Sequence, residues 1–223
     1  MGFACSRRRV GLGVLAVVGV AAAAATLGAW QRSEPVEQGM RLVGRGEYVP
    51  AARALVRAVA LSPRDARAHY YLGLAYAGIG RREAALSHLQ EAVHLNPDDA
   101  RFHDGLGQAY RRIGDAARAL GELEEAVRRG PDTPRYEVAL AGLLLEQGRL
   151  PEAAAHLQQL ARAEPRSAGI RLLLADVLKQ AGDRKGMENE YREAIRLADG
   201  TALGELARRE LRAALVDGDD PQP

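Results

Sequence analysis

Histidines are the first place where this sequence could carry chemistry, because imidazole is the commonest protein ligand for metals. His69 and His103 lie 34 residues apart, and His88 and His156 lie 68 apart. The first two could form a metal pair on neighbouring repeats, or they could pack between helices as aromatic side chains. We favour packing for His69 and His103, and we expect His88 and His156 at exposed or rim positions. No metal site is predicted.

Nucleophilic and acid–base chemistry has no recognisable motif here. The sequence contains no Gly-x-Ser-x-Gly, no Walker lysine loop, no Cys-x-x-Cys and no His-Glu-x-x-His. The densest carboxylate cluster, at 122–125, is followed at helical spacing by Arg128 and Arg129, so a solvated salt-bridge face explains it. Cys5 is the single cysteine and permits no intrachain disulfide. We therefore expect neither enzymatic activity nor a cofactor.

The composition favours helices packed on helices. Of the 223 residues, 47% are hydrophobic but only 4% are aromatic, which suits helix packing better than a β-sandwich. The net charge of +2 provides no strong field for nucleic acid. Lys179 and Lys185 are the only lysines among 31 basic residues, and this arginine bias suggests a bacterial coding sequence.

Three residue types recur at intervals of 34 positions. A glycine can supply the left-handed residue between two helices, a proline can end the second helix, and an alanine lets two helix axes approach. A period of this length predicts stacked helical pairs instead of one globular core. The glycines are Gly46, Gly80, Gly114, Gly148 and Gly182, the prolines are Pro63, Pro97, Pro131 and Pro165, and the alanines are Ala51, Ala85, Ala119 and Ala153.

The clearest copies of the repeat occupy residues 66–99 and 100–133. Leu72-Gly73-x-x-Tyr76 in the first returns as Leu106-Gly107-x-x-Tyr110 in the second. With the alanine, leucine and proline that follow at fixed distances, this pattern resembles the tetratricopeptide repeat (TPR) family. The resemblance implies an all-α solenoid of five helix-turn-helix repeats followed by a capping helix.

The expected boundaries follow from the period. The first repeat lacks the leucine and tyrosine of the motif, as terminal repeats often do, and its second helix is predicted at Pro50–Leu61. Leucines after residue 201 recur at helical spacing and predict one amphipathic helix that covers the last repeat. The repeats are placed at 32–65, 66–99, 100–133, 134–167 and 168–201, the capping helix at 202–216 and a disordered tail at 217–223.

The N-terminal segment predicts a membrane helix. Residues 1–9 form a basic tail, and the apolar run that follows, within 10–30, is long enough to cross a bilayer. We favour an uncleaved signal-anchor with a cytoplasmic N-terminus, which places the repeats in the periplasm or exterior. The alternative is a cleaved secretory signal peptide and a soluble secreted protein.

The resemblance also implies where a partner binds. In TPR proteins the first helix of each repeat lines a concave groove, and arginines in three consecutive repeats map there. Such arginines would pair carboxylates of an extended peptide. The alternative is that Arg67 and Arg101 pair locally with Asp65 and Asp99 at the helix starts. The groove candidates are Arg67, Tyr70, Arg101, Asp104, Gln108, Arg111, Arg135, Asp176 and Lys179.

These expectations define a scaffold that recruits a protein or peptide, possibly acidic, and does not bind nucleic acid. By analogy with bacterial TPR proteins, it would serve assembly of a cell-envelope, secretion or cytochrome-maturation complex in the inner membrane. Two alternatives remain open: an accessory subunit that delivers substrate to a separate enzyme, and homo-oligomerisation through the apolar repeat ends. Tyr70 and Leu74 stand where a chaperone-type carboxylate clamp would need basic and amide groups, which argues against that role.

Overall fold

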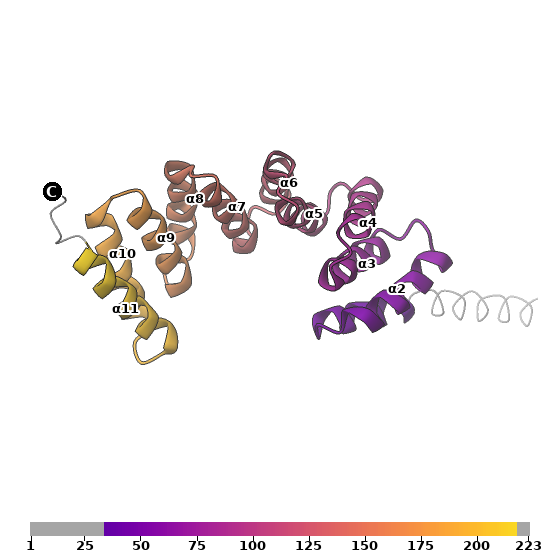
Figure 1. The fold of residues 1–223 in the computed structure, drawn as a ribbon, viewed down its shortest axis with the longest axis horizontal. Coiled ribbons are helices and arrows are strands. Elements are labelled where there is room, and N and C mark those ends of the chain that lie inside the picture. Colours follow the sequence, from indigo (N-terminus) through magenta and orange to yellow (C-terminus); the bar gives the residue numbers. More distant parts are fainter. Residues whose placement is uncertain (1–33, 218–223) are drawn as a thin grey trace, which may run out of the picture. The chain divides into compact units, whose positions relative to one another are not determined.

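A computed structural model describes residues 34–217 of the chain (Figure 1). All regular elements in this range are helices, with no strand among the residues described. The chain divides between Asn96 and Pro97 into two compact units, which are described separately. The predicted all-α fold is therefore confirmed for this part of the chain.

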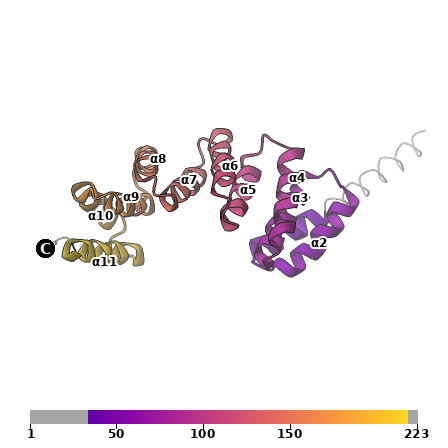
Figure 2. The same ribbon diagram turned by 45° about the horizontal axis from the view of Figure 1, so that its top comes forward.

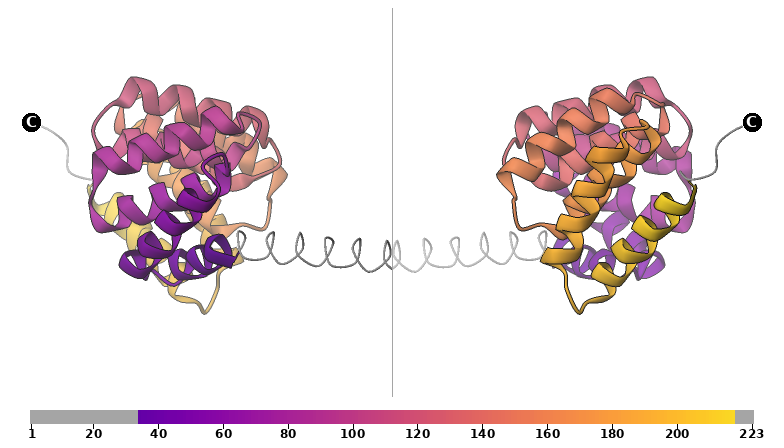
Figure 3. Two further views of the ribbon diagram at one scale, coloured as in Figure 1. Left: turned by 90° about the vertical axis from the view of Figure 1, so that its right-hand side faces the viewer. Right: turned by 90° about the vertical axis from the view of Figure 1, so that its left-hand side faces the viewer.

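The first unit comprises a helical segment at 34–44 and the helices α2 (Tyr48–Leu61), α3 (Ala66–Ile79) and α4 (Arg82–Leu95). Helix α3 packs against both α2 and α4 (Figure 3, left view). Helix α2 begins two residues earlier than predicted, so Pro50 is its third residue instead of its first. Proline is tolerated there because the N–H groups of the first turn have no partner within the helix.

The second unit contains three helical pairs and a final helix. Consecutive helices in the unit pack against one another, and α11 lies against both α9 and α10 (Figures 2 and 3). This confirms the predicted capping helix. The helices are α5 (Ala100–Arg112), α6 (Ala116–Arg129), α7 (Pro134–Glu146), α8 (Leu150–Ala163), α9 (Ala168–Gln180), α10 (Arg184–Leu197) and α11 (Ala202–Asp217).

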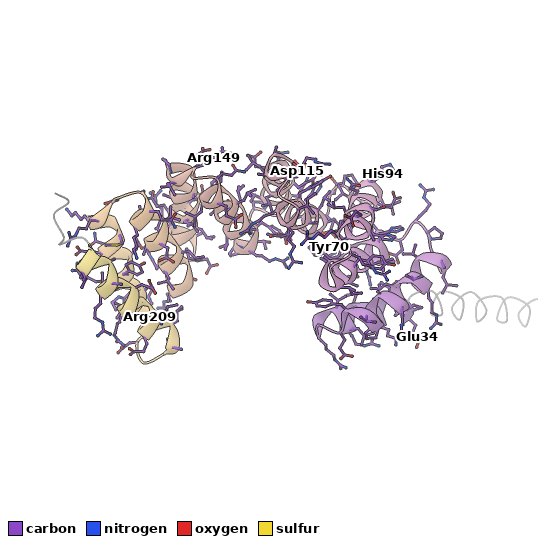
Figure 4. All side chains as sticks on the ribbon, in the orientation of Figure 1. Glu34, Tyr70, His94, Asp115, Arg149 and Arg209 are labelled. Atoms are coloured by element: carbon purple, nitrogen blue, oxygen red, sulfur yellow. The ribbon has the colours of Figure 1, made fainter. Side chains whose placement is uncertain are left out.

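The turns within the pairs use glycine as predicted. Gly114, between α5 and α6, has φ +82°, a backbone conformation that side chains with a Cβ rarely adopt. The N–H of Asp115 then donates to the carbonyl of Tyr110 at 3.0 Å, which satisfies an acceptor at the end of α5. Asp115 also caps α6 by accepting from the backbone N–H of Arg118 (Figure 4). The glycines 34 residues before and after have the same positive φ.

The recurring small residues bring the paired helices together. A Cβ built on Gly107 in α5 would lie 2.8 Å from Cγ of Leu123 in α6, so only glycine fits without a shift. Gly73 and Leu89 repeat this contact in the first unit, at 2.6 Å. The predicted alanine positions are fully buried, with at most 1% of each residue exposed at Ala51, Ala85, Ala119 and Ala153.

The recurring prolines follow the ends of the second helices. Helices α2, α4, α6 and α8 each end two residues before the proline, at Leu61, Leu95, Arg129 and Ala163. Proline offers no N–H to continue the helical hydrogen bonds, so the helix stops and the chain turns into the next pair. The sequence thus predicted these ends correctly.

The predicted membrane or signal helix, at 10–30, and the basic tail before it lie outside the described residues. Within residues 34–217, no helix combines the length and the apolar character needed to cross a bilayer.

Candidate functional site

A cavity of about 390 Å³ opens in the second unit, on the side formed by the first helix of each pair. Its lining comes from α5, α7 and α9, with Leu157 contributed by α8. The floor is apolar and includes Val138, Leu145, Leu173 and Val177. An open apolar cavity with few polar groups around it is a typical ligand site. The polar side chains are those of Gln108, Arg111, Arg135 and Asp176, all four of which the sequence analysis proposed.

Arg111 is held in place by a carboxylate from the next pair. Its Nε donates to Oε2 of Glu146 at 2.9 Å, and its Nη2 donates to the other oxygen of the same group. This hydrogen-bonded ion pair raises the pKa of Arg111 and lowers the pKa of Glu146. The guanidinium nitrogens lie 3.8 and 3.9 Å from where a Cβ on Gly142 would be. The absence of a side chain at Gly142 therefore keeps the cavity open beneath Arg111.

Arg135 pairs with the buried carboxylate of Asp104. Only 1% of the Asp104 side chain is exposed, whereas 68% of the Arg135 side chain is exposed. Burial raises the pKa of Asp104 above its ordinary value, and the charge of Arg135 offsets part of that rise. Gln108 lies at 3.5 Å from the same carboxylate. Asp104 thus positions Arg135 from below, and one face of the guanidinium remains in solvent.

Asp176 accepts a hydrogen bond from the hydroxyl of Tyr191, a fully buried residue of α10. Burial and the adjacent carboxylate raise the pKa of Tyr191 above its ordinary value, so the phenol stays protonated and remains a donor. This bond fixes the Asp176 side chain at the edge of the cavity. The sequence analysis did not identify Tyr191 as its partner.

The remaining candidates do not line this cavity. Arg101 donates to Asp99 from Nε at 2.9 Å and from Nη2 at 2.6 Å, the local pairing considered as the alternative. Arg67, in the first unit, pairs with Glu37, while its backbone N–H donates to Asp65. Tyr70 is 5% exposed and packs edge-on against Tyr71 (Figure 4), and Lys179 is exposed on α9.

Each of the three ladder arginines therefore already has a carboxylate partner. These partners are Glu37 for Arg67, Asp99 for Arg101 and Asp104 for Arg135. A ligand carboxylate would have to share or displace them, so the arginines do not form a bare cationic wall. The apolar floor is instead the part of the site that lacks a partner.

A second recurring feature was missed by the sequence analysis. In four successive pairs, a polar side chain on the first helix bonds to one exactly 19 residues later on the second. The signal was present, since these positions also recur every 34 residues. The bonds join His69 to His88, His103 to Glu122, Glu137 to His156 and Arg171 to Glu190, with nitrogen–nitrogen or nitrogen–oxygen distances of 3.1, 2.7, 2.7 and 2.9 Å.

The histidines of these pairs have structural partners. His69 and His103 are each 7% exposed, and their Nε2 atoms lie 3.1 and 2.9 Å from the carbonyls of Pro63 and Pro97. Packing between helices, which the sequence analysis favoured, accounts for both. His88 is half-buried and stacks on Tyr76 at 5.6 Å between ring centroids, so it is less exposed than expected.

Family models for the tetratricopeptide repeat match residues 36–100 and 76–134, and a further one matches 144–186. Together these stretches cover more than half of the chain, which therefore belongs to the tetratricopeptide repeat family. This fold is typical of protein–protein interaction. No curated protein matches the sequence.

Solved structures share the fold at low sequence identity. PilF of Pseudomonas aeruginosa is 19% identical with a TM-score of 0.71, covering 86% of this chain and 87% of its own. MamA is 18% identical with a TM-score of 0.66, covering 77% and 93%. YrrB, described as a TPR protein with an unusual peptide-binding site, is 18% identical with a TM-score of 0.63, covering 78% and 90%. At these identities the likeness shows the fold alone.

Proposed function

We propose that this protein is a scaffold that binds a segment of a partner protein in the second-unit cavity. The observation that carries the proposal is the apolar floor, where Leu173 is 40% exposed without a neighbour to cover it. Around it, Arg111, Arg135 and Asp176 are each held by a partner side chain. Fixed polar groups around an apolar floor fit a peptide that inserts one apolar side chain.

The arginines give this site its second requirement. Arg135 keeps most of its guanidinium in solvent, and arginine carries five N–H donors, so it can hold Asp104 and still donate to a ligand. A carboxylate near the apolar anchor of the partner would accept those bonds. We therefore favour a partner segment that combines an apolar anchor with an acidic residue.

The proposal is tested by capture of partners from bacterial membranes with the full chain. Leu173→Glu places a charge on the exposed part of the floor, and we expect it to abolish capture of the specific partner. Gln158→Glu, on an exposed position of α8, adds the same charge away from the floor and should capture as the parent does. Equal capture by all three proteins, with helicity unchanged, would exclude the cavity as the binding site.

The arginine requirement has its own test. We expect Arg135→Glu to weaken binding of the captured acidic partner by roughly tenfold, which corresponds to loss of one charge-assisted hydrogen bond. The combined replacement of Arg67, Arg101 and Arg135 should then weaken binding little further, because the first two have local partners. A large additional loss would show that the ladder acts as a unit.

We further propose that residues 10–30 anchor the protein in the bacterial inner membrane with the repeats on the periplasmic side. The support is the length and apolar character of that run and the basic tail before it. Carbonate extraction should leave the protein in the membrane pellet, and protease added to spheroplasts should digest the repeats. A mature protein whose sequence starts within or beyond residues 21–30 would instead show a cleaved signal peptide.

A further inference from the structure

The outer face of α2 differs from those of the other second helices. Of the eight large hydrophobic side chains that are exposed among the described residues, four lie on α2 and a fifth, Ile79, ends the adjacent α3. Val49 and Val56 are 52% and 47% exposed, and Tyr48 and Leu61 lie at the two ends of α2. They lie beside a hollow of about 470 Å³, lined by α2, the end of α3 and Arg81.

The charges on this helix have one sign. Helix α2 carries Arg53 and Arg57 and no carboxylate, whereas α4, α6, α8 and α10 each carry at least one glutamate. Both arginines are exposed, and neither has an ion pair with any of the described residues. Most exposed arginines elsewhere in the described chain lie beside an acid. The α2 face therefore combines apolar side chains with uncompensated positive charge.

Such a face has the chemistry of an interfacial helix. Helices that lie on bilayers bury apolar side chains at the boundary between headgroups and acyl chains, and arginines around them contact anionic headgroups. The long aliphatic stems of Arg53 and Arg57 can lie along that boundary with their guanidinium groups among the phosphates. A soluble acidic peptide would satisfy the arginines but would not require this extent of apolar surface.

The chain length permits this contact. If the membrane helix ends at Ala29, the chain to Glu34 spans at most about 18 Å, since an extended residue covers roughly 3.5 Å. The helical segment 34–44 adds about 16 Å along its axis. The start of α2 is therefore held within a few tens of ångströms of the bilayer, at a high effective concentration relative to its surface.

We propose that the α2 face, formed by Val49, Arg53, Val56, Arg57 and Ile79, docks on the anionic lipid surface of the membrane that anchors the chain. The first unit then rests against the bilayer instead of extending freely from its anchor. This inference rests on the proposed membrane anchoring, which the test below separates from it.

The test uses the full chain in nanodiscs with and without phosphatidylglycerol. Cys5 is replaced by serine, and a single cysteine at Val56 carries an environment-sensitive fluorophore. A cysteine at Gln158 provides the matched control, because it occupies the same repeat position on α8, which carries a glutamate. We expect nitroxide-labelled lipid to quench the Val56 probe strongly in anionic nanodiscs and the Gln158 probe weakly. Adding Arg53→Glu and Arg57→Glu should remove most of the difference.

The alternative outcomes are distinct. An unquenched Val56 probe in a chain that is inserted in the nanodisc would overturn the docking and leave the anchoring intact. If the chain does not insert, the anchoring fails, and sedimentation with phosphatidylglycerol vesicles decides the docking: binding that falls by about tenfold or more in the double arginine variant supports it, and absence of binding overturns it. A blue shift of the Val56 probe that depends on protein concentration without lipid would show self-association of this face and would also overturn the proposal.

Discussion

His88 is a base that faces another base, at a position where the following pairs place a base against an acid. Its Nδ1 lies 3.1 Å from Nδ1 of His69, so one ring must donate and the other must accept. Only the neutral pair, or a pair that shares one added proton, satisfies that contact. In the second unit, His103 faces Glu122 and His156 faces Glu137, which favour the protonated imidazole. The first unit therefore contains the pair that acid disrupts.

The expected consequence is a loss of stability in mild acid. Burial, followed by the charge of His69, lowers the pKa of His88 in the folded state, although Glu91 opposes the shift. The unfolded chain, whose histidines have an ordinary pKa near 6.5, therefore binds more protons. The contribution of His88 to the free energy of unfolding is unaffected well above pH 6.5. It becomes unfavourable as the pH falls below that value.

Replacing His88 by glutamate tests this interpretation, because it creates the pair that His103 and Glu122 already form. We expect the variant to gain about 1 kcal/mol over the parent at pH 5.5, relative to their difference at pH 7.5. Urea unfolding at both pH values measures this. His88→Gln is the control, since it removes the titration without adding a charge. The same pH dependence in all three proteins would contradict the assignment.

The Asp104–Arg135 pair permits a second test at this scale. Arg135→Gln leaves a buried carboxylate without its counter-charge, and we expect a loss of about 1–2 kcal/mol at pH 7, a figure reduced because Arg135 is largely exposed. In an Asp104→Asn background the same change should cost much less. Thermal or urea unfolding of the four proteins gives the coupling. Additive effects would show that the pair does not position Arg135.

Among the elements, the helix ends were predictable because they depend on local chemistry repeated at a fixed interval. Glycine at positive φ and proline two residues past a helix act within a few residues, so the sequence exposes them directly. Pro50 shows the limit, since proline is accepted at the first or the third position of a helix with little difference in local energy. The pattern therefore placed α2 correctly but not its first residue.

The site was less predictable because its partners come from different elements. Four cavity residues were named from the first helices, yet Glu146, Asp104 and Tyr191 hold three of them across gaps of 35, 31 and 15 residues. An exposed glutamate looks the same in the sequence whether or not an arginine reaches it. The arginine ladder was consequently overestimated as a cationic wall, and the apolar floor was underestimated.

Gly114 and Gly121 make a matched pair for testing the turn. Gly114→Val should cost about 1–2 kcal/mol, because a β-branched residue at φ +82° is strained although nothing crowds the site. Gly121 lies in the interior of α6 with open space around it, so Gly121→Ala should stabilise by about 0.5–1 kcal/mol. Melting temperatures of the two variants should shift in opposite directions. A parent-like melting temperature for Gly114→Val would contradict the turn assignment.

On the scale of the whole molecule, each unit has its own core and its own cavity. The first unit buries Leu55 and Leu72 among α2 and α3, and its hollow lies under the α2 face. The second unit buries Leu123, Leu144 and Leu174, and its cavity contains the proposed partner site. A division of labour follows, in which the first unit contacts the membrane and the second binds the partner.

Separating the units tests this division. Residues 97–223 contain every residue that lines the partner cavity, together with α11, which buries Ala207 against the preceding helices. We expect this fragment to fold cooperatively on its own and to capture the same partner as the full chain, because stability in repeat proteins comes from each repeat and its neighbours. Circular dichroism during thermal unfolding and partner capture would measure the two properties.

A fragment that starts at Asp115 provides the control for that experiment. It lacks α5, so α6 loses the helix against which it packs and the cavity loses Gln108 and Arg111. We expect it to unfold at a lower temperature and to capture little partner. If residues 97–223 were unfolded, or folded but unable to capture the partner, the second unit would not be a self-sufficient binding module, and partner binding would have to involve the first unit as well.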